Sequence, residues 1–147
     1  MIRGLFESHL PVRDLERSIA FYTDVVGLSL GMKEEGRRIA FCFAGGWGHT
    51  MVGLWEKPAD AIVQQHIAFE VALDDLTAAI ENLNRARVQP LDFFHQVTDV
   101  PTVLAWMPAV SIYFKDPDDH LLEFIAKLPG DPQPERGLVP WDEWNAG

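Results

Sequence analysis

The sequence is poor in cysteine, in basic residues and in long apolar runs. Its single cysteine, Cys42, excludes an internal disulfide and fits a reducing compartment. Lysine and arginine total 12 against 22 acidic residues and are scattered along the chain, which argues against a nucleic-acid partner. No apolar run reaches the roughly 18 residues of a membrane helix, and Glu7 and His9 lie where a signal peptide would be apolar. We therefore expect a cytoplasmic protein without a membrane or nucleic-acid partner.

The order strand, helix, strand, strand, strand is predicted twice along the 147 residues. Strands are expected at 5–12, 28–33, 38–44 and 50–56, with a helix over 14–27 that Asp14 caps and Gly27 ends. After a linker at 57–63, a strand at 66–73, a helix over 75–87 and strands at 91–97, 103–114 and 120–126 repeat the order, and Pro108 marks the place for a bend in the middle one. Each unit would expose a sheet face that its copy can cover, so the repetition predicts an α+β fold of two βαβββ units, about 2–57 and 64–127.

The chain changes character after the second unit. Residues 1–128 are predicted to form a single domain, whereas 129–147 are rich in proline and glycine and follow no helical or strand period. Trp141 and Trp144 would be unusual in a free tail, so we expect this segment to pack on the domain or on a partner subunit.

Three polar residues stand out within predicted strands: His9, His66 and Glu123. Strand side chains alternate, so each shares a face with apolar neighbours, and a buried carboxylate is costly unless a cation neutralises it. Taken singly, each histidine is an ordinary strand residue, but the two occupy equivalent places in the two units. Two imidazoles and one carboxylate are a recognised ligand set for a divalent ion such as Fe, Mn, Ni or Zn.

Three stretches resemble the vicinal-oxygen-chelate superfamily: HLPVRDLERSIAFYTDVVGL from His9, QQHIAFEV around His66, and IYFKDPDDHLLEF before and after Glu123. This superfamily includes glyoxalase I, extradiol dioxygenases, fosfomycin-resistance thiol transferases, methylmalonyl-CoA epimerase and bleomycin-resistance proteins. The resemblance covers about residues 2–127, and Asp119 stands where glycine is usual in the turn before the glutamate.

The resemblance implies that the two units form a partly open, eight-stranded, barrel-like sheet. It also implies His9, His66 and Glu123 as ligands of a metal that chelates adjacent oxygens of a small-molecule substrate. Relatives commonly form twofold dimers, so a homodimer is expected. The sequence leaves open whether a site is built within one chain or from strands of two subunits.

The residues around the proposed metal leave several chemistries open. Glyoxalase I has a fourth ligand on the fourth strand, where our alignment places Gly53; Glu56 would reach that place only after a register slip. Extradiol dioxygenases have a tyrosine ten residues before the glutamate, as Tyr113 is here, but the histidine expected before it is missing. Fosfomycin transferases match Tyr113 and Ser111, yet no lysine or arginine for a phosphonate occurs between residues 89 and 113.

The candidate proton-transfer residues are Glu70, which would share a face with a proposed ligand, and Tyr113, which the resemblance implies. Glu7 is a weaker candidate, and the remaining histidines, at 49, 95 and 120, are interpreted as surface or rim residues. We therefore predict a metal-dependent enzyme with lyase, isomerase or dioxygenase chemistry. The alternative is a metal-free, bleomycin-resistance-like protein that binds a small apolar ligand in the same cavity.

Overall fold

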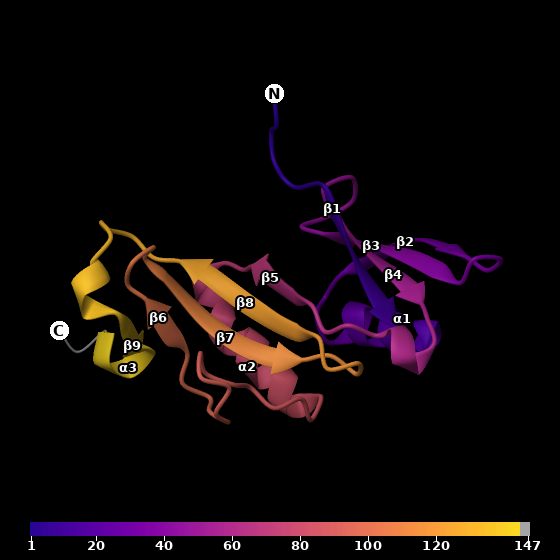
Figure 1. Ribbon diagram of the computed structural model, residues 1–147. Helices are drawn as coiled ribbons and strands as arrows, with labels where there is room; N and C mark the ends of the chain where they lie inside the picture. Colours follow the sequence, from indigo (N-terminus) through magenta and orange to yellow (C-terminus); the bar gives the residue numbers. More distant parts are fainter. Residues whose placement is uncertain (145–147) are drawn as a thin grey trace. The chain divides into compact units, whose positions relative to one another are not determined.

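The computed structural model describes residues 1–144 and divides the chain into two compact units (Figure 1). The first unit comprises residues 1–65 and 116–120, and the second comprises 66–115 and the chain from 121 onward. Each unit contains one sheet and begins with the order βαβββ, and the second unit continues into a further strand and a short helix, so the predicted α+β class and the internal repetition are confirmed. Neither sheet closes on itself, in agreement with the partly open arrangement that was expected.

The first unit holds a four-stranded sheet in the order β1-β4-β3-β2. Strands β1 and β4 are parallel, and the other neighbours are antiparallel. Its elements are β1 (Glu7–Val12), α1 (Leu15–Asp24), β2 (Ser29–Glu34), β3 (Ile39–Ala44), β4 (Thr50–Glu56) and a single 3₁₀ turn, η1 (Ala59–Ala61).

Helix α1 begins and ends as the sequence predicts. Asp14 is its N-cap and accepts a hydrogen bond from the backbone N–H of Arg17 at 3.0 Å, and Gly27 takes a left-handed φ of 87° after the last turn. The buried face of the helix, with Leu15 and Tyr22, lies against the sheet side that carries Leu10 and Leu54.

The turn 116–120 belongs to the first unit and is held by buried polar contacts. Asp116 accepts from the Tyr22 hydroxyl at 2.9 Å, and Asp118 accepts from the backbone N–H of Arg13 at 3.0 Å. His120 is fully buried: Nδ1 accepts from the Gln65 N–H at 3.0 Å and Nε2 donates to the Pro11 carbonyl at 2.7 Å. The expectation that His120 is a surface or rim residue is therefore wrong, because both ring nitrogens are satisfied inside the unit.

The second unit holds a five-stranded sheet in the order β5-β8-β7-β6-β9, in which β5 and β8 are parallel. Its apolar face includes Leu122 and Phe124, while α2 buries Leu76, Ile80 and Leu83. The elements are β5 (His66–Glu70), η2 (Leu73–Asp75), α2 (Leu76–Arg85), β6 (Thr102–Leu104), β7 (Ala109–Lys115), β8 (Leu121–Lys127), η3 (Pro134–Arg136), β9 (Leu138–Pro140) and α3 (Trp141–Trp144).

Two strands of the second unit differ from the prediction. The expected strand at 91–97 is a loop closed by a single bridge between its end residues, because the Asp92 carboxylate accepts from the backbone N–H groups of Phe94 and Gln96 at 2.8 Å. The expected strand at 103–114 is divided into β6 and β7 by a turn over residues 105–108, where Pro108 has no N–H to donate to a ladder.

The tail adds a ninth strand to the eight expected. Strand β9 pairs with β6, and the backbone N–H of Trp141 donates to the Pro101 carbonyl at 2.9 Å. The last three residues of the predicted tail, 145–147, lie outside the described residues. In the part of the chain that the structure describes, no helix is long and apolar enough to span a membrane.

Candidate metal centre

One face of the second sheet collects most of the predicted site residues. In the strand register Ala68 lies opposite Glu123, and Glu123 lies opposite Tyr113. Residues two apart on a strand share a face, so His66 and Glu70 lie on the same side as Glu123 and Tyr113. The four second-unit residues predicted from the sequence therefore come from three neighbouring strands and one face.

His66 and Glu123 form the centre of this face. The His66 Nδ1 lies 3.1 Å from the Leu121 carbonyl oxygen, which can only accept, so Nδ1 carries a proton. The opposite nitrogen, Nε2, lies 3.1 Å from a Glu123 carboxylate oxygen. In a neutral imidazole, the lone pair of Nε2 then points at the negatively charged Glu123 carboxylate. A second proton on the ring or a bound metal cation would stabilise this arrangement. The His66 side chain is 48% exposed, so an ion can reach it from solvent.

The Glu123 carboxylate is buried, with 5% of the residue exposed. Its second oxygen accepts a short hydrogen bond from the Ser111 hydroxyl, which fixes the orientation of the carboxylate. Burial, the negative charge of Glu123 and a hydrogen bond with its carboxylate raise the pKa of the Tyr113 phenol. The contact with Ser111 is the support that a buried ligand carboxylate needs.

Glu70 lies further along the same face, and its carboxylate is paired with a lysine instead of with His66 or Tyr113. Its carboxylate is exposed and forms an ion pair with Lys127 at 2.9 Å. A proton acceptor at this place would first have to release the lysine, and exposed pairs of this kind are weak.

His95 is exposed, as the sequence interpretation expected, and lies on a loop beside the site face. Its ring lies 6.5 Å from the ring of Tyr113, and its backbone has a left-handed φ of 61°. Phe93 from the same loop lies 6.2 Å from Tyr113. The loop 92–96 therefore brings an imidazole and an aromatic ring close to Tyr113, and no pattern in the sequence marks this approach.

The third predicted ligand, His9, lies on β1 in the first unit. Its ring is 5.9 Å from the Phe41 ring and 5.7 Å from the Trp55 ring. The Trp55 indole N–H donates a short hydrogen bond to His9 Nδ1, which leaves the proton of the neutral ring on Nε2. His9, Pro11, Trp55 and Lys57 line an open cavity of about 380 Å³. To bind a metal through Nε2, His9 would have to give up the bond from Trp55.

The described first unit has no fourth ligand of the glyoxalase I kind on β4. His9 lies opposite Gly53 in the register, as His66 lies opposite Leu121, so the residue equivalent to Glu123 is Trp55 rather than Gly53. A side chain at Gly53 would begin 2.6 Å from the His9 ring.

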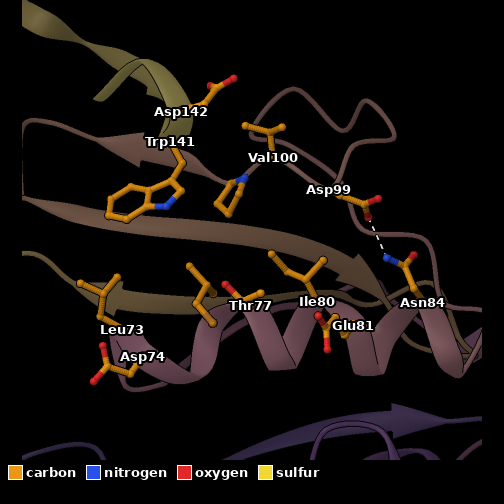
Figure 2. Close-up of a pocket in the computed structure, with 12 residues that line it drawn as sticks. Leu73, Asp74, Thr77, Ile80, Glu81, Asn84, Asp99, Val100, Trp141 and Asp142 are labelled. Atoms are coloured by element: carbon orange, nitrogen blue, oxygen red, sulfur yellow. Dashed lines mark hydrogen bonds between the residues drawn. The ribbon is translucent and has the colours of Figure 1, made fainter. Parts of the chain in front are cut away.

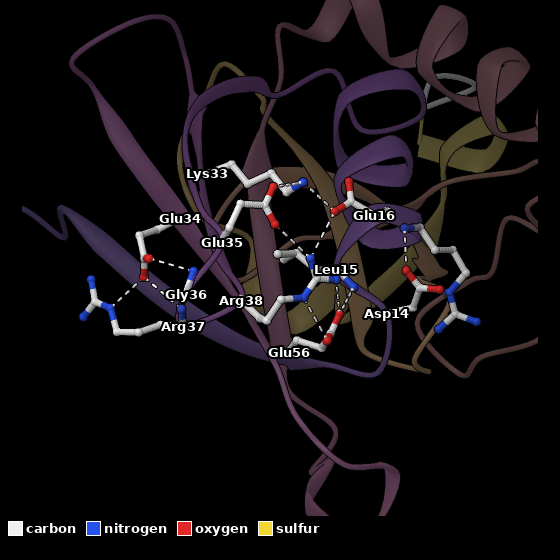
Figure 3. A network of polar contacts seen from close by, with 11 residues as sticks. Asp14, Leu15, Glu16, Lys33, Glu34, Glu35, Gly36, Arg37, Arg38 and Glu56 are labelled. Carbon is white, nitrogen blue, oxygen red and sulfur yellow. Dashed lines mark hydrogen bonds and ion pairs between the residues drawn. The ribbon is translucent and has the colours of Figure 1, made fainter.

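Glu56 cannot take the place of this ligand without losing its own partners. Its oxygens accept from the Arg38 guanidinium at 2.7 Å and from the Leu15 N–H at 2.9 Å (Figure 3). The hydrogen bond from Arg38 holds the pKa of Glu56 below its ordinary value. Glu56 therefore anchors the start of α1.

The second unit holds two of the three predicted ligands, His66 and Glu123. Over its described residues, no third histidine, cysteine, aspartate or glutamate joins His66 and Glu123 to form a metal site. A neutral imidazole nitrogen and a supported carboxylate oxygen are donors that suit Fe, Mn, Ni or Zn. The two βαβββ units and these strand residues agree with the class of protein to which the sequence motifs pointed.

Comparison with known proteins identifies the family. A model of the Glyoxalase/Bleomycin resistance protein/Dioxygenase superfamily matches residues 5–124, and the chain belongs to this superfamily. The expected resemblance is thereby confirmed.

Individual relatives differ in what they do. A solved structure from the mobile metagenome of Halifax Harbour Sewage Outfall, integron cassette protein HFX_CASS4, is 36% identical with a TM-score of 0.74, over 85% of this chain and 99% of that one. Metallothiol transferase FosB of Lysinibacillus sphaericus (strain C3-41) is 32% identical over 115 residues, 77% of this chain and 74% of the relative. The Bleomycin resistance protein of Geobacillus stearothermophilus is 24% identical over 131 residues, 81% of this chain and 93% of the relative.

Proposed function

We propose that this protein is a divalent-metal-dependent enzyme that acts on a small molecule through two adjacent oxygen atoms. The proposed ligands are His9, His66 and Glu123, and a bound cation would supply Lewis acidity to the substrate oxygens. The observation that carries the proposal is the His66–Glu123 pair, in which the imidazole Nε2 lies 3.1 Å from an oxygen of a buried carboxylate.

The other residues of the site face have proposed roles around these ligands. Ser111 orients Glu123, and the Tyr113 hydroxyl acts as a hydrogen-bond donor beside it. Glu70 is the proposed proton acceptor once Lys127 releases it, and His95 is a second candidate on the loop beside Tyr113. Lyase, isomerase and dioxygenase chemistry all need such a proton-transfer group next to the chelated oxygens.

The assembly belongs to the same proposal. His9 is contributed by the first unit of the same chain or of a second copy, in a cytoplasmic homodimer. A site shared between copies would make the metal affinity depend on protein concentration, whereas a site within one chain would not.

Metal titration of the purified apoprotein tests the ligand set. Calorimetry with Mn²⁺, Ni²⁺ and Zn²⁺ should give one site per chain, and His66→Ala and Glu123→Gln should each weaken binding more than about 100-fold. His49→Ala, which removes an exposed histidine outside the proposed set, is the matched control and should bind as the wild type does. Equal affinity in all four proteins would refute the ligand set.

Activity of the metal-loaded protein tests the enzyme assignment. A catechol reports ring cleavage, and a glutathione hemithioacetal reports isomerisation. Turnover that requires metal and is lost in His66→Ala supports the proposal.

The alternative is a metal-free protein that binds an apolar small ligand, and one observation favours it. His9 lies beside the Phe41 and Trp55 rings and is already hydrogen-bonded to Trp55, so the cavity that it lines in the first unit can hold an apolar ligand without a metal. The 24% identical relative named as a bleomycin resistance protein is consistent with such a role. A binder would keep its ligand affinity in His66→Ala and in the presence of a chelator.

A further inference from the structure

A second cavity lies in the second unit between α2, the residues before β6 and the beginning of α3. Its volume is about 690 Å³, within the range of pockets that take small organic ligands. Figure 2 shows Trp141 reaching from the tail toward the side chains of α2, with Val100 and Asp99 on the adjoining loop. The cavity lies away from the site face, because α2 packs on the opposite side of the sheet.

The inner surface of this cavity is apolar and well anchored. Leu76 and Ile80 of α2 are buried in its floor, and Pro101 and Trp141 form the opposite wall. The backbone N–H of Trp141 donates to the Pro101 carbonyl at 2.9 Å, and the pairing of β9 with β6 holds the residues before Trp141. The tryptophan therefore stands on a fixed segment of backbone.

The rim of the cavity is negatively charged. The acidic residues that line it are Asp74, Glu81, Asp99 and Asp142, and no lysine, arginine or histidine is among the lining residues. Asp99 accepts a hydrogen bond from the Asn84 side chain at 2.8 Å, and none of the four acids forms an ion pair with a described residue. Four carboxylates around an apolar cavity repel anions and attract cations.

We propose that this cavity binds a small organic cation, an amine attached to an aromatic or aliphatic body. The body would lie against Trp141, Leu76 and Ile80, and the ammonium group would face the acidic rim. The indole of Trp141 adds a second attraction, because a cation near an aromatic face is stabilised by its quadrupole. This inference does not depend on the proposed metal site.

A series of three indoles of similar size separates charge from shape. Tryptamine carries a cation, tryptophol is neutral and indole-3-propionate is an anion. Calorimetry or ligand-observed NMR should show tryptamine binding at least about 10-fold more tightly than tryptophol, and no binding of the propionate. Affinity for tryptamine should fall as salt rises. Equal binding of tryptamine and tryptophol, or no binding of tryptamine, would overturn the proposal.

Variants locate the binding in this cavity. Asp74 lies at the start of α2, where the helix dipole also favours an acid, and Asp99 is hydrogen-bonded to Asn84, so Glu81 and Asp142 are the residues to neutralise. Glu81→Gln combined with Asp142→Asn should weaken tryptamine binding about 5- to 10-fold and leave that of tryptophol unchanged.

The controls use neighbouring positions. Glu143→Gln removes an exposed acid that does not line the cavity, and should bind tryptamine as the wild type does. Trp141→Leu should weaken both tryptamine and tryptophol, and His66→Ala should affect neither. If Glu143→Gln weakened tryptamine as much as the double variant, binding would reflect general surface charge and the cavity assignment would be wrong.

Discussion

The imidazole of His66 and the carboxylate of Glu123 meet at 3.1 Å across the parallel strands β5 and β8. The Leu121 carbonyl oxygen accepts a hydrogen bond from His66 Nδ1, and the Ser111 hydroxyl donates one to Glu123 Oε1, so Nε2 and Oε2 face each other. Each of the two side chains is thus oriented by a second residue. Hydrogen bonds of this kind orient the ligands of a metal site before the metal binds.

Ser111→Ala should weaken metal binding by about 10- to 100-fold without removing a ligand, because it leaves the Glu123 carboxylate free to rotate. It should also lower the free energy of unfolding by about 1–3 kcal/mol, because a buried carboxylate loses a hydrogen bond. Metal titration and urea unfolding measure the two effects.

Ser18→Ala is the matched control for this change. Ser18 is fully buried, and its hydroxyl is the buried side-chain group without a hydrogen-bond partner among the described residues. Its removal should leave metal affinity unchanged and should not lower stability. Equal metal affinity in Ser111→Ala and the wild type would show that Glu123 needs no such support.

Trp55→Phe should strengthen metal binding by about 2- to 10-fold. The indole N–H now occupies His9 Nδ1, and a net hydrogen bond of about 1 kcal/mol must be given up before His9 binds through Nε2. Phenylalanine keeps an aromatic ring beside the histidine but donates nothing. A loss of metal affinity in this variant would indicate that Trp55 holds His9 in the binding position instead of competing for it.

Asp119→Val should lower the free energy of unfolding by about 1–2 kcal/mol, whereas Asp119→Gly should change it by less than about 1 kcal/mol. Asp119 has a φ of 67°, in the left-handed region that glycine adopts freely and a β-branched residue resists. Urea denaturation of the two variants measures the difference. Equal stability would show that the turn before Glu123 does not require this backbone conformation.

The stabilising effect of Asp118 should depend on pH. Burial alone would raise the pKa of its carboxyl, but hydrogen bonds from Arg13 and the charges of Arg13 and Arg17 outweigh burial and hold the pKa below its ordinary 3.8. A folded-state pKa below the unfolded one stabilises the protein above about pH 4, and this contribution is lost as pH falls further.

Asp118→Asn isolates this contribution from that of Asp116, whose pKa is raised by burial and whose effect has the opposite sign. The variant should be less stable than the wild type by about 1–3 kcal/mol at pH 7. The difference in free energy of unfolding should shrink in urea titrations below the ordinary pKa of 3.8. A difference that is constant with pH would contradict the assignment.

Much of the fold could be predicted because its determinants are local. Residues close together in the sequence determine the periodicity of α1, its Asp14 cap and its end at Gly27. The repeated order of elements predicted the two units. The error falls where a side chain overrides strand propensity, because Asp92 closes a loop in a segment that reads as a strand. The break at Pro108 could be anticipated, since proline has no N–H to donate to a ladder.

The candidate site was partly predictable for a similar reason. His66, Tyr113 and Glu123 follow from the alternation of strand side chains once the strands pair. The burial of His120 depends on Gln65 and Pro11, which are distant in the sequence, so local patterns did not reveal it. His95 is exposed as expected, but its approach to Tyr113 depends on a loop conformation that the sequence does not show.

The most direct measurement is a crystal structure of the zinc-loaded protein with anomalous data collected on both sides of the zinc edge. Our account predicts one anomalous peak for each His66–Glu123 pair, with the nitrogens of His66 and of a His9 and an oxygen of Glu123 at about 2.0–2.2 Å. A peak coordinated by other residues, or an empty pair under saturating zinc, would contradict it.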